Sequence, residues 1–145
     1  MIAIIQRVSQ ASVAVDGQII SQIGPGMLVL AAIEAGDTET QLTWMASKIV
    51  TLRIFRNGEK HFDVDVKQIG GSILLVSQFT LAADASQGRR PSFSGAAPPA
   101  EAEKLFDRFI RLVQETGVPV QTGKFGANMQ VSLINDGPAT FSLRS

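Results

Sequence analysis

Residues 2–33 have the sequence IAIIQRVSQASVAVDGQIISQIGPGMLVLAAI, which sets the fold class. Ile2–Val8 and Ala11–Val15 are β-branched runs of the kind found in strands. Asp16-Gly17 then offers a two-residue turn, which predicts an opening β-hairpin that ends near Ile23. Met27–Ile33 is apolar without alternation and is typical of a buried strand. The chain therefore begins with sheet.

Two helices are predicted beyond this stretch. Thr38 and Gln41 have the spacing of a capping box, and apolar residues at helical spacing continue to about Leu52. Pro98-Pro99 suits the start of a second helix, which has one apolar face and which Gly117 closes.

The remaining segments favour strands and loops. Asn57-Gly58 is a turn signal, and Ala82–Pro99 has the composition of a long loop, which in so short a chain is more often functional than idle. The further predicted strands are Ser72–Leu81 after Gly70-Gly71, Val118–Thr122, Met129–Ile134 and Thr140–Leu143. About eight strands and two helices indicate one sheet-rich mixed α/β (α+β) domain over residues 1–145.

Composition narrows the class of function. The 145 residues are 45% hydrophobic and 18% charged, which is globular and mildly favours self-association. Cysteine is absent, so thiolate nucleophiles and disulfides are excluded and a cytoplasmic location is expected. No apolar run is long enough to span a membrane, and 13 basic residues balance 13 acidic ones. An RNA ligand would therefore need a local basic patch or a grip on a small part of the RNA.

Histidine or metal chemistry has little support. His61 is the only histidine and stands in a polar turn region, so a surface position is favoured over a general base. Asp63 and Asp65 share a face if that stretch is extended, but two carboxylates beside one histidine make a weak metal site. We expect no metal and no cofactor.

Three short motifs carry candidate chemistry. Ser77-Gln78-Phe79-Thr80 interrupts an apolar strand at its end, where it is either a site or simply the point at which the strand reaches the surface. Asn135-Asp136-Gly137-Pro138-Ala139-Thr140 between two strands is either a plain turn or a site. Gln87-Gly88-Arg89-Arg90-Pro91 places two arginines on a loop, where they are either solvated or meet phosphates.

Taken together, these motifs resemble the D-aminoacyl-tRNA deacylase family over residues 1–144. The resemblance rests on Ser77–Thr80 and Asn135–Thr140. It is supported by Ile5–Val8, Leu52–Phe55, Gly70-Gly71, Arg90–Phe93 and Thr122–Ala127. One departure is clear, because Lys60-His61-Phe62-Asp63 stands where the family usually has Lys-Met-Asn.

The resemblance implies a three-layer β/β/α domain that forms a homodimer with two sites at its interface, where the 3′ end of aminoacyl-tRNA binds; neither DNA nor a membrane is an expected partner. It assigns the catalytic pocket to Ser77, Gln78, Phe79 and Thr80, and the rejection of L-amino acids to Gly137 and Pro138 of the other subunit. The terminal adenosine would lie on Phe125, Met129 and Ala102, and the supporting residues would be Arg7, Asn135 and Thr140.

Two mechanisms for ester hydrolysis remain open. Backbone N–H groups near Phe79 and Thr80 would form an oxyanion hole while the vicinal 2′-hydroxyl of the RNA assists, or the Thr80 hydroxyl would act as nucleophile. We favour the backbone account because no base is evident beside Thr80. A D-residue would point away from the Gly137–Pro138 carbonyls, whose peptide bond we expect to be cis, while glycine would escape rejection.

Two alternative functions also remain. The related deacylase type that accepts some L-aminoacyl-tRNAs has a different pocket motif, so the intact Ser77–Thr80 sequence argues against it. A non-catalytic module that binds the tRNA end differs from both because it would not turn over substrate.

Overall fold

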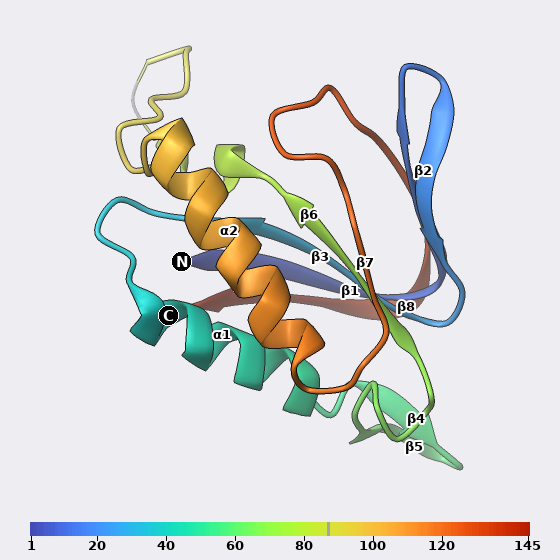
Figure 1. Ribbon diagram of the computed structural model, residues 1–145. Helices are drawn as coiled ribbons and strands as arrows, with labels where there is room; N and C mark the ends of the chain where they lie inside the picture. Colours follow the sequence, from blue (N-terminus) through green and yellow to red (C-terminus); the bar gives the residue numbers. More distant parts are fainter. Residues whose placement is uncertain (87) are drawn as a thin grey trace.

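The computed structural model describes residues 1–86 and 88–145 as two helices, a short 3-10 helix and eight strands (Figure 1). The first half of the chain contains β1 (Ile2–Val15), β2 (Gln18–Ile23), β3 (Gly26–Ala32), α1 (Glu39–Thr51), β4 (Phe55–Asn57) and β5 (Lys60–Val64). The second half contains β6 (Ser72–Ser77), the 3-10 helix η1 (Phe79–Ala82), α2 (Pro99–Gln114), β7 (Val120–Thr122) and β8 (Gln130–Arg144).

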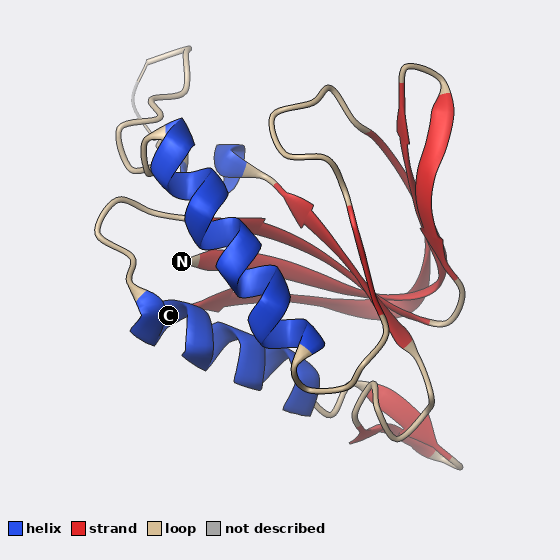
Figure 2. Cartoon of the chain, viewed as in Figure 1, coloured by secondary structure: helices blue, strands red, loops and turns tan. Residues whose placement is uncertain are grey.

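These elements form the predicted mixed fold, with two sheet layers and one helical layer. The main sheet contains β3, β6 and β7, which are parallel to one another at each shared edge, and β1, which is antiparallel to β3 and to β8. Helices α1 and α2 lie together on one side of this sheet, and the β1–β2 hairpin rises on the other side (Figure 2). No helix within the described ranges, 1–86 and 88–145, is long and apolar enough to cross a membrane.

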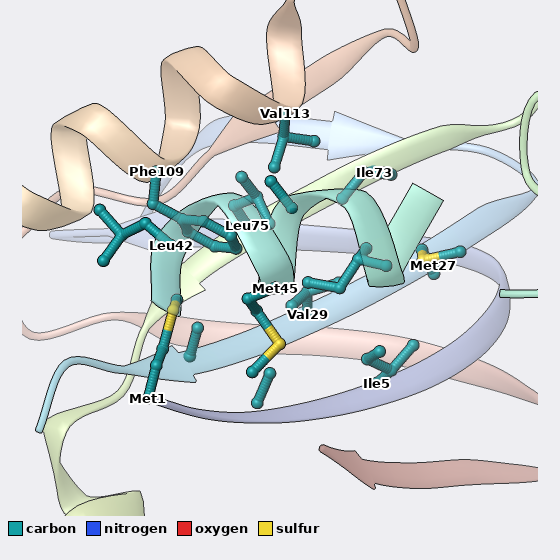
Figure 3. Close-up of a cluster of buried hydrophobic side chains, with 14 of the residues drawn as sticks. Met1, Ile5, Met27, Val29, Leu42, Met45, Ile73, Leu75, Phe109 and Val113 are labelled. Atoms are coloured by element: carbon teal, nitrogen blue, oxygen red, sulfur yellow. The ribbon is translucent and has the colours of Figure 1, made fainter. Parts of the chain in front are cut away.

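The larger hydrophobic core lies between the helices and the main sheet (Figure 3). Leu42 and Met45 of α1 and Phe109 of α2 pack there against inward residues of β1 and β3, such as Ile5 and Val29. All five side chains are fully buried, and each contributes about 1.5–3 kcal/mol relative to an exposed position. This core holds α2 against the strand ends, where the candidate site lies.

A second, smaller core lies where this sheet curls over itself, with residues from β3 and β6 in one layer and from β2 and the second half of β1 in the other. It consists of Val8, Ala11, Val13, Ile23, Leu28, Leu74 and Val76. Strand β1 serves both cores: its first half pairs with β3 and its second half with β2, while β8 pairs along both halves. The register of β1 against β8 shifts on either side of Val8. Arg7 and Val8 are both buried, so the alternation of buried and outward side chains along β1 changes phase between them.

Several local predictions are confirmed. Asp16 and Gly17 both have positive φ, 51° and 78°, as the mirror-image hairpin turn requires. Thr38 and Gln41 form the capping box at the start of α1. The Gly137–Pro138 peptide bond is cis.

Three predicted boundaries are wrong. Ser9 and Gln10 do not interrupt β1, because pairing with β8 carries the strand through them. Strand β6 ends at Ser77 and not at Leu81, since the chain turns into η1. Strand β8 continues from Gln130 to Arg144 where two strands with a turn between them were predicted.

Candidate active site

A cavity of about 500 Å³ opens where β6 ends beside the start of α2. Three parts of the chain form it: the end of β6 with the residues that follow, the start of α2, and the segment that leads into β8. Its lining consists of Val76, Ser77, Gln78, Phe79, Ala97, Pro99, Ala102, Phe125, Gly126, Ala127, Asn128, Met129 and Val131. Six of the predicted site residues therefore share one cavity: Ser77, Gln78, Phe79, Ala102, Phe125 and Met129.

The backbone changes direction at Gln78, and this turn determines which main-chain groups lie beside the cavity. The Gln78 N–H donates to the Ala31 carbonyl at 2.8 Å, so β3 holds the end of β6. The next residues, Phe79 and Thr80, begin η1, and the first N–H groups of a helix have no acceptor within it. Gln78, at the N-cap position, makes no side-chain hydrogen bond to them. These N–H groups are thus available to a ligand oxygen beside the cavity.

The side chains around this turn are polar but lack a strong base. The Gln78 amide donates to the Thr80 hydroxyl, which is itself exposed and does not line the cavity. Phe79 is 58% exposed and packs against Phe93, with ring centroids 5.2 Å apart. The exposed Phe79 ring offers an apolar surface at the cavity mouth.

The opposite wall is apolar and well supported. Phe125 packs against Phe106 of α2 at 6.2 Å between ring centroids, and Ala102 is buried on the same helix. The Met129 sulfur accepts a hydrogen bond from the Lys124 N–H at 3.3 Å, which folds the intervening segment. An aromatic ring, a thioether and a methyl group therefore form one wall, which suits a flat heterocycle.

Two of the three predicted supporting residues, Arg7 and Asn135, meet at a second place, around Asp136. Arg7 is 2% exposed, and its Nε donates to the Asp136 carbonyl at 2.8 Å and lies 3.0 Å from the Asp136 Oδ2. The Asn135 amide donates to the Arg7 carbonyl at 2.9 Å and to the Ala139 carbonyl at 3.2 Å. Arg7 and Asn135 thus brace both sides of the Gly137–Pro138 segment.

Thr140, the third predicted supporting residue, contacts β1. Its hydroxyl accepts a hydrogen bond from the Gln6 amide at 3.2 Å, so it ties β8 to β1 and not to Gly137 or Pro138. Gly137 is required by close packing, because a Cβ there would lie 2.4 Å from the Asn135 Oδ1.

The two places are far apart within one chain. Ser77 lies opposite Ala31 in β3, and Ala31 lies opposite Ala3 in β1. Ala3 in turn lies opposite Leu143 in β8. Leu143 therefore lies three strands away from Ser77 across the sheet, which is about 14 Å. Gly137 lies six residues before Leu143 along β8, which adds about 20 Å in the direction of the strands. One chain's Gly137–Pro138 segment does not reach its own cavity.

His61 and the nearby carboxylates form no metal site in the structure. The His61 side chain is exposed, and the His61 carbonyl accepts a hydrogen bond from Arg7. A hydrogen bond from Asn57, together with Lys60 and Arg53, holds the pKa of Asp63 below its usual value despite some desolvation. Within residues 1–86 and 88–145 no three acidic or histidine side chains gather as metal ligands.

The predicted arginine loop is described only in part. Gln87 lies outside the described residues, while Arg89 and Arg90 are exposed. The loop is tied across its base by paired backbone hydrogen bonds between Asp84 and Ser92, both 2.8 Å.

Comparison with known proteins gives the family. The model of the family described as D-Tyr-tRNA(Tyr) deacylase matches residues 4–144. The D-aminoacyl-tRNA deacylase of Chlorobaculum parvum is 55% identical over 146 residues, which cover 100% of this chain and 98% of the relative. That of Geobacter sulfurreducens is 53% identical over 143 residues, 99% of this chain and 94% of the relative. The chain belongs to the D-aminoacyl-tRNA deacylase family.

Two solved structures share the fold of this chain. A protein titled c-Myc DNA Unwinding Element Binding Protein matches with a TM-score of 0.95 and 42% identity, covering 100% of this chain and 99% of that one. A probable eukaryotic D-amino acid tRNA deacylase matches with a TM-score of 0.82 over 98% of this chain and 97% of that one. At 20% identity the second match shows the fold alone.

Sequence reasoning missed part of this candidate site. Ala97, Pro99 and Asn128 line the cavity, yet they belong to loops or to the start of a helix and carry no motif. Asp136 stands within the Asn135–Thr140 motif but was assigned no role of its own. The signal for Asp136 lay in Arg7, because an arginine that alternates with the inward Ala3 and Ile5 needs a buried acceptor.

Proposed function

We propose that this chain hydrolyses the ester bond between a D-amino acid and the terminal ribose of tRNA, releasing the free amino acid and the tRNA. The observation that carries the proposal is the cavity at the end of β6, where the first turn of η1, which has no side-chain cap, lies beside an apolar wall. Family membership supplies the substrate class. Because that substrate is charged tRNA, we propose that the protein works in the cytoplasm.

The backbone N–H groups of Phe79 and Thr80 stabilise the negative charge that develops on the ester carbonyl oxygen. One donor of this kind typically lowers the barrier by about 3 kcal/mol. Water attacks the carbonyl carbon, the bond to the 3′-oxygen breaks, and that oxygen leaves with a proton. The neighbouring 2′-hydroxyl of the ribose assists this proton transfer. The terminal adenine lies against Phe125, Met129 and Ala102.

Selection against L-amino acids comes from a second copy of the chain. The Gly137–Pro138 segment cannot reach its own cavity, so we propose that it enters the cavity of the partner in a homodimer. Exposed isoleucines on the same outer layer, Ile19 and Ile134, supply apolar surface for such an interface. An L side chain would meet the segment, a D side chain would avoid it, and glycine has no side chain to exclude.

Multiple-turnover hydrolysis of matched D- and L-tyrosyl-tRNA tests the proposal. We expect many turnovers with the D-substrate, few with the L-substrate, and measurable hydrolysis of glycyl-tRNA. Binding of the tRNA end without turnover would instead identify a non-catalytic module. Comparable turnover of both tyrosyl substrates would contradict the chiral selection.

A further inference from the structure

We infer that Phe62, on the β4–β5 hairpin, is a positioning residue that fixes the Gly137–Pro138 segment and thereby sets how strictly L-aminoacyl groups are excluded. This inference rests on the proposed function of that segment. Phe62 lines no part of the cavity, so it acts through other residues.

Arg7 is the first link between Phe62 and the segment. Its Nε donates to the carbonyl of Asp136, the residue directly before Gly137, and the same nitrogen pairs with the Asp136 carboxylate. A buried guanidinium with two contacts to one residue fixes the place of that residue. The position of Gly137 therefore depends on the position of Arg7.

The β4–β5 hairpin and the residue before it form the second link, because they hold Arg7 from the other side. The Arg7 Nη1 donates to the Ile54 carbonyl at 2.6 Å and to the His61 carbonyl at 3.1 Å. The guanidinium carbon lies 5.6 Å from the centre of the Phe62 ring, which is within the range of a cation–π interaction. Two carbonyls and an aromatic face thus orient the guanidinium.

Phe62 also contacts the strand that carries the segment. Its ring packs edge-to-face on Phe141 of β8, with centroids 5.9 Å apart and planes at 84°. Arg56 of the same hairpin adds a longer ion pair to the Asp136 carboxylate, 3.8 Å. The hairpin therefore touches β1, β8 and Asp136, and Phe62 makes two of these contacts.

Because Phe62 is about half exposed, a role in positioning Arg7 can be distinguished from a role in core packing. The side chain is 52% exposed, so its removal deletes little buried apolar surface. Its ring is instead the surface on which Arg7 rests. Loss of the ring would leave the catalytic N–H groups of the cavity in place while it frees Arg7 and the segment to shift. The effect should therefore fall on selectivity and not on the rate with the D-substrate.

The test measures kcat/KM for D- and L-tyrosyl-tRNA with Phe62→Leu, Phe62→Tyr and, as a control, Trp44→Leu. Trp44 is a half-exposed aromatic on α1 and takes no part in the contacts of Arg7 and Phe62 described above. In Phe62→Leu we expect L-hydrolysis to rise about threefold to tenfold, the range expected for a lost cation–π contact. D-hydrolysis should stay within about twofold in every variant. Phe62→Tyr, which keeps the ring, and Trp44→Leu should retain the selectivity of the unmodified protein.

A second measurement does not depend on activity. The Arg7 Nε–H resonance should exchange slowly with solvent in the unmodified protein and in Phe62→Tyr, and faster in Phe62→Leu. Unchanged selectivity in Phe62→Leu, or an equal fall in both rates, would overturn the inference. If the unmodified protein lacks D-selective hydrolysis, the proposed function fails, and Arg7 exchange still decides whether Phe62 positions Arg7.

Discussion

At the scale of single residues, the candidate site depends on main-chain groups more than on reactive side chains. Thr80 carries the only hydroxyl in η1, and this hydroxyl already accepts a hydrogen bond from Gln78. His61, the only histidine, presents an exposed side chain on β5. A threonine hydroxyl without an adjacent base is a poor nucleophile.

Thr80→Ala should therefore preserve hydrolysis of D-tyrosyl-tRNA to within about tenfold, which is 1.4 kcal/mol of barrier. The N–H at position 80 remains in this variant, so the proposed oxyanion contacts remain as well. Single-turnover rates would show the effect directly. A fall of several orders of magnitude in a folded variant would make the hydroxyl the nucleophile.

Gly137→Ala should weaken the rejection of L-substrates. The added Cβ would lie 2.4 Å from the Asn135 Oδ1, so the Asn135 side chain must move away from the Arg7 and Ala139 carbonyls. We expect a loss of stability of about 1–3 kcal/mol and a rise in L-tyrosyl-tRNA hydrolysis. Gly24→Ala is the matched control, because a Cβ there meets nothing within 4 Å. If the Gly137→Ala protein still rejects L-substrates as well as the unmodified protein does, position 137 has no steric role in that rejection.

At the scale of elements, the first turn of α2 supplies a wall of the cavity. Ala102→Leu should raise KM for D-aminoacyl-tRNA about tenfold, because the larger side chain occupies space assigned to the terminal adenine. Ala100→Leu, at an exposed position on the same helix, should leave KM unchanged. Steady-state kinetics with both variants separates the two results, and equal KM values would place the adenine elsewhere.

The elements that sequence predicts well are those with local chemical signals. The Asp16-Gly17 turn and the Thr38 capping box need only neighbouring residues, and both are confirmed. The continuity of β1 through Ser9 and of β8 through Asn135 depends on pairing between distant strands. No local propensity records that pairing.

The same contrast between local signals and long-range packing explains which residues of the candidate site were predicted. The family resemblance assigned Ser77, Phe125 and Ala102 to one site, and one cavity contains all three. Pro99 joins that cavity as the first residue of α2, and Asn128 joins it from the segment that leads into β8. Their place follows from tertiary packing and was invisible in the sequence.

At the scale of the whole molecule, an ion cluster joins distant parts of the chain. The Met1 amino group lies 3.0 Å from the Glu34 carboxylate and 2.7 Å from that of Asp37, and Arg144 of β8 also pairs with Glu34. Burial raises the pKa of Glu34, but hydrogen bonds and charge from the amino group and Arg144 together lower it below 4.5.

This lowered pKa predicts acid sensitivity. Because the folded state binds the proton of Glu34 less tightly than the unfolded state, the contribution of Glu34 is complete above pH 4.5 and is lost as the pH falls through its lower folded value. Thermal unfolding from pH 7 to pH 3 should show that Glu34→Gln destabilises the protein at neutral pH and that the difference narrows in acid. Glu59→Gln, at an exposed turn, is the control. A difference that is constant over this range would exclude the ion cluster as its source.

The proposed sharing of the site between two subunits also predicts complementation. In mixed dimers of Ala102→Leu and Gly137→Ala chains, the open cavity belongs to the Gly137→Ala chain, and the segment that enters it comes from the other chain with an intact Gly137. An excess of Ala102→Leu chains should therefore restore L-rejection to the Gly137→Ala protein. Sedimentation should show a dimer at working concentrations. Continued leakage in the mixture, or an active selective monomer, would contradict exchange of the segment.

The pairing of β1 with β8 also has a consequence for the synthesis of the protein. Gln6 and Thr140 bond to each other across 134 residues, so β1 leaves the ribosome long before its partner strand exists. At a synthesis rate of about 5–20 residues per second, one edge of β1 waits roughly 7 to 27 seconds. An open strand edge invites pairing with other chains. The nascent chain is therefore exposed to aggregation through the edge of β1 until β8 has been synthesised.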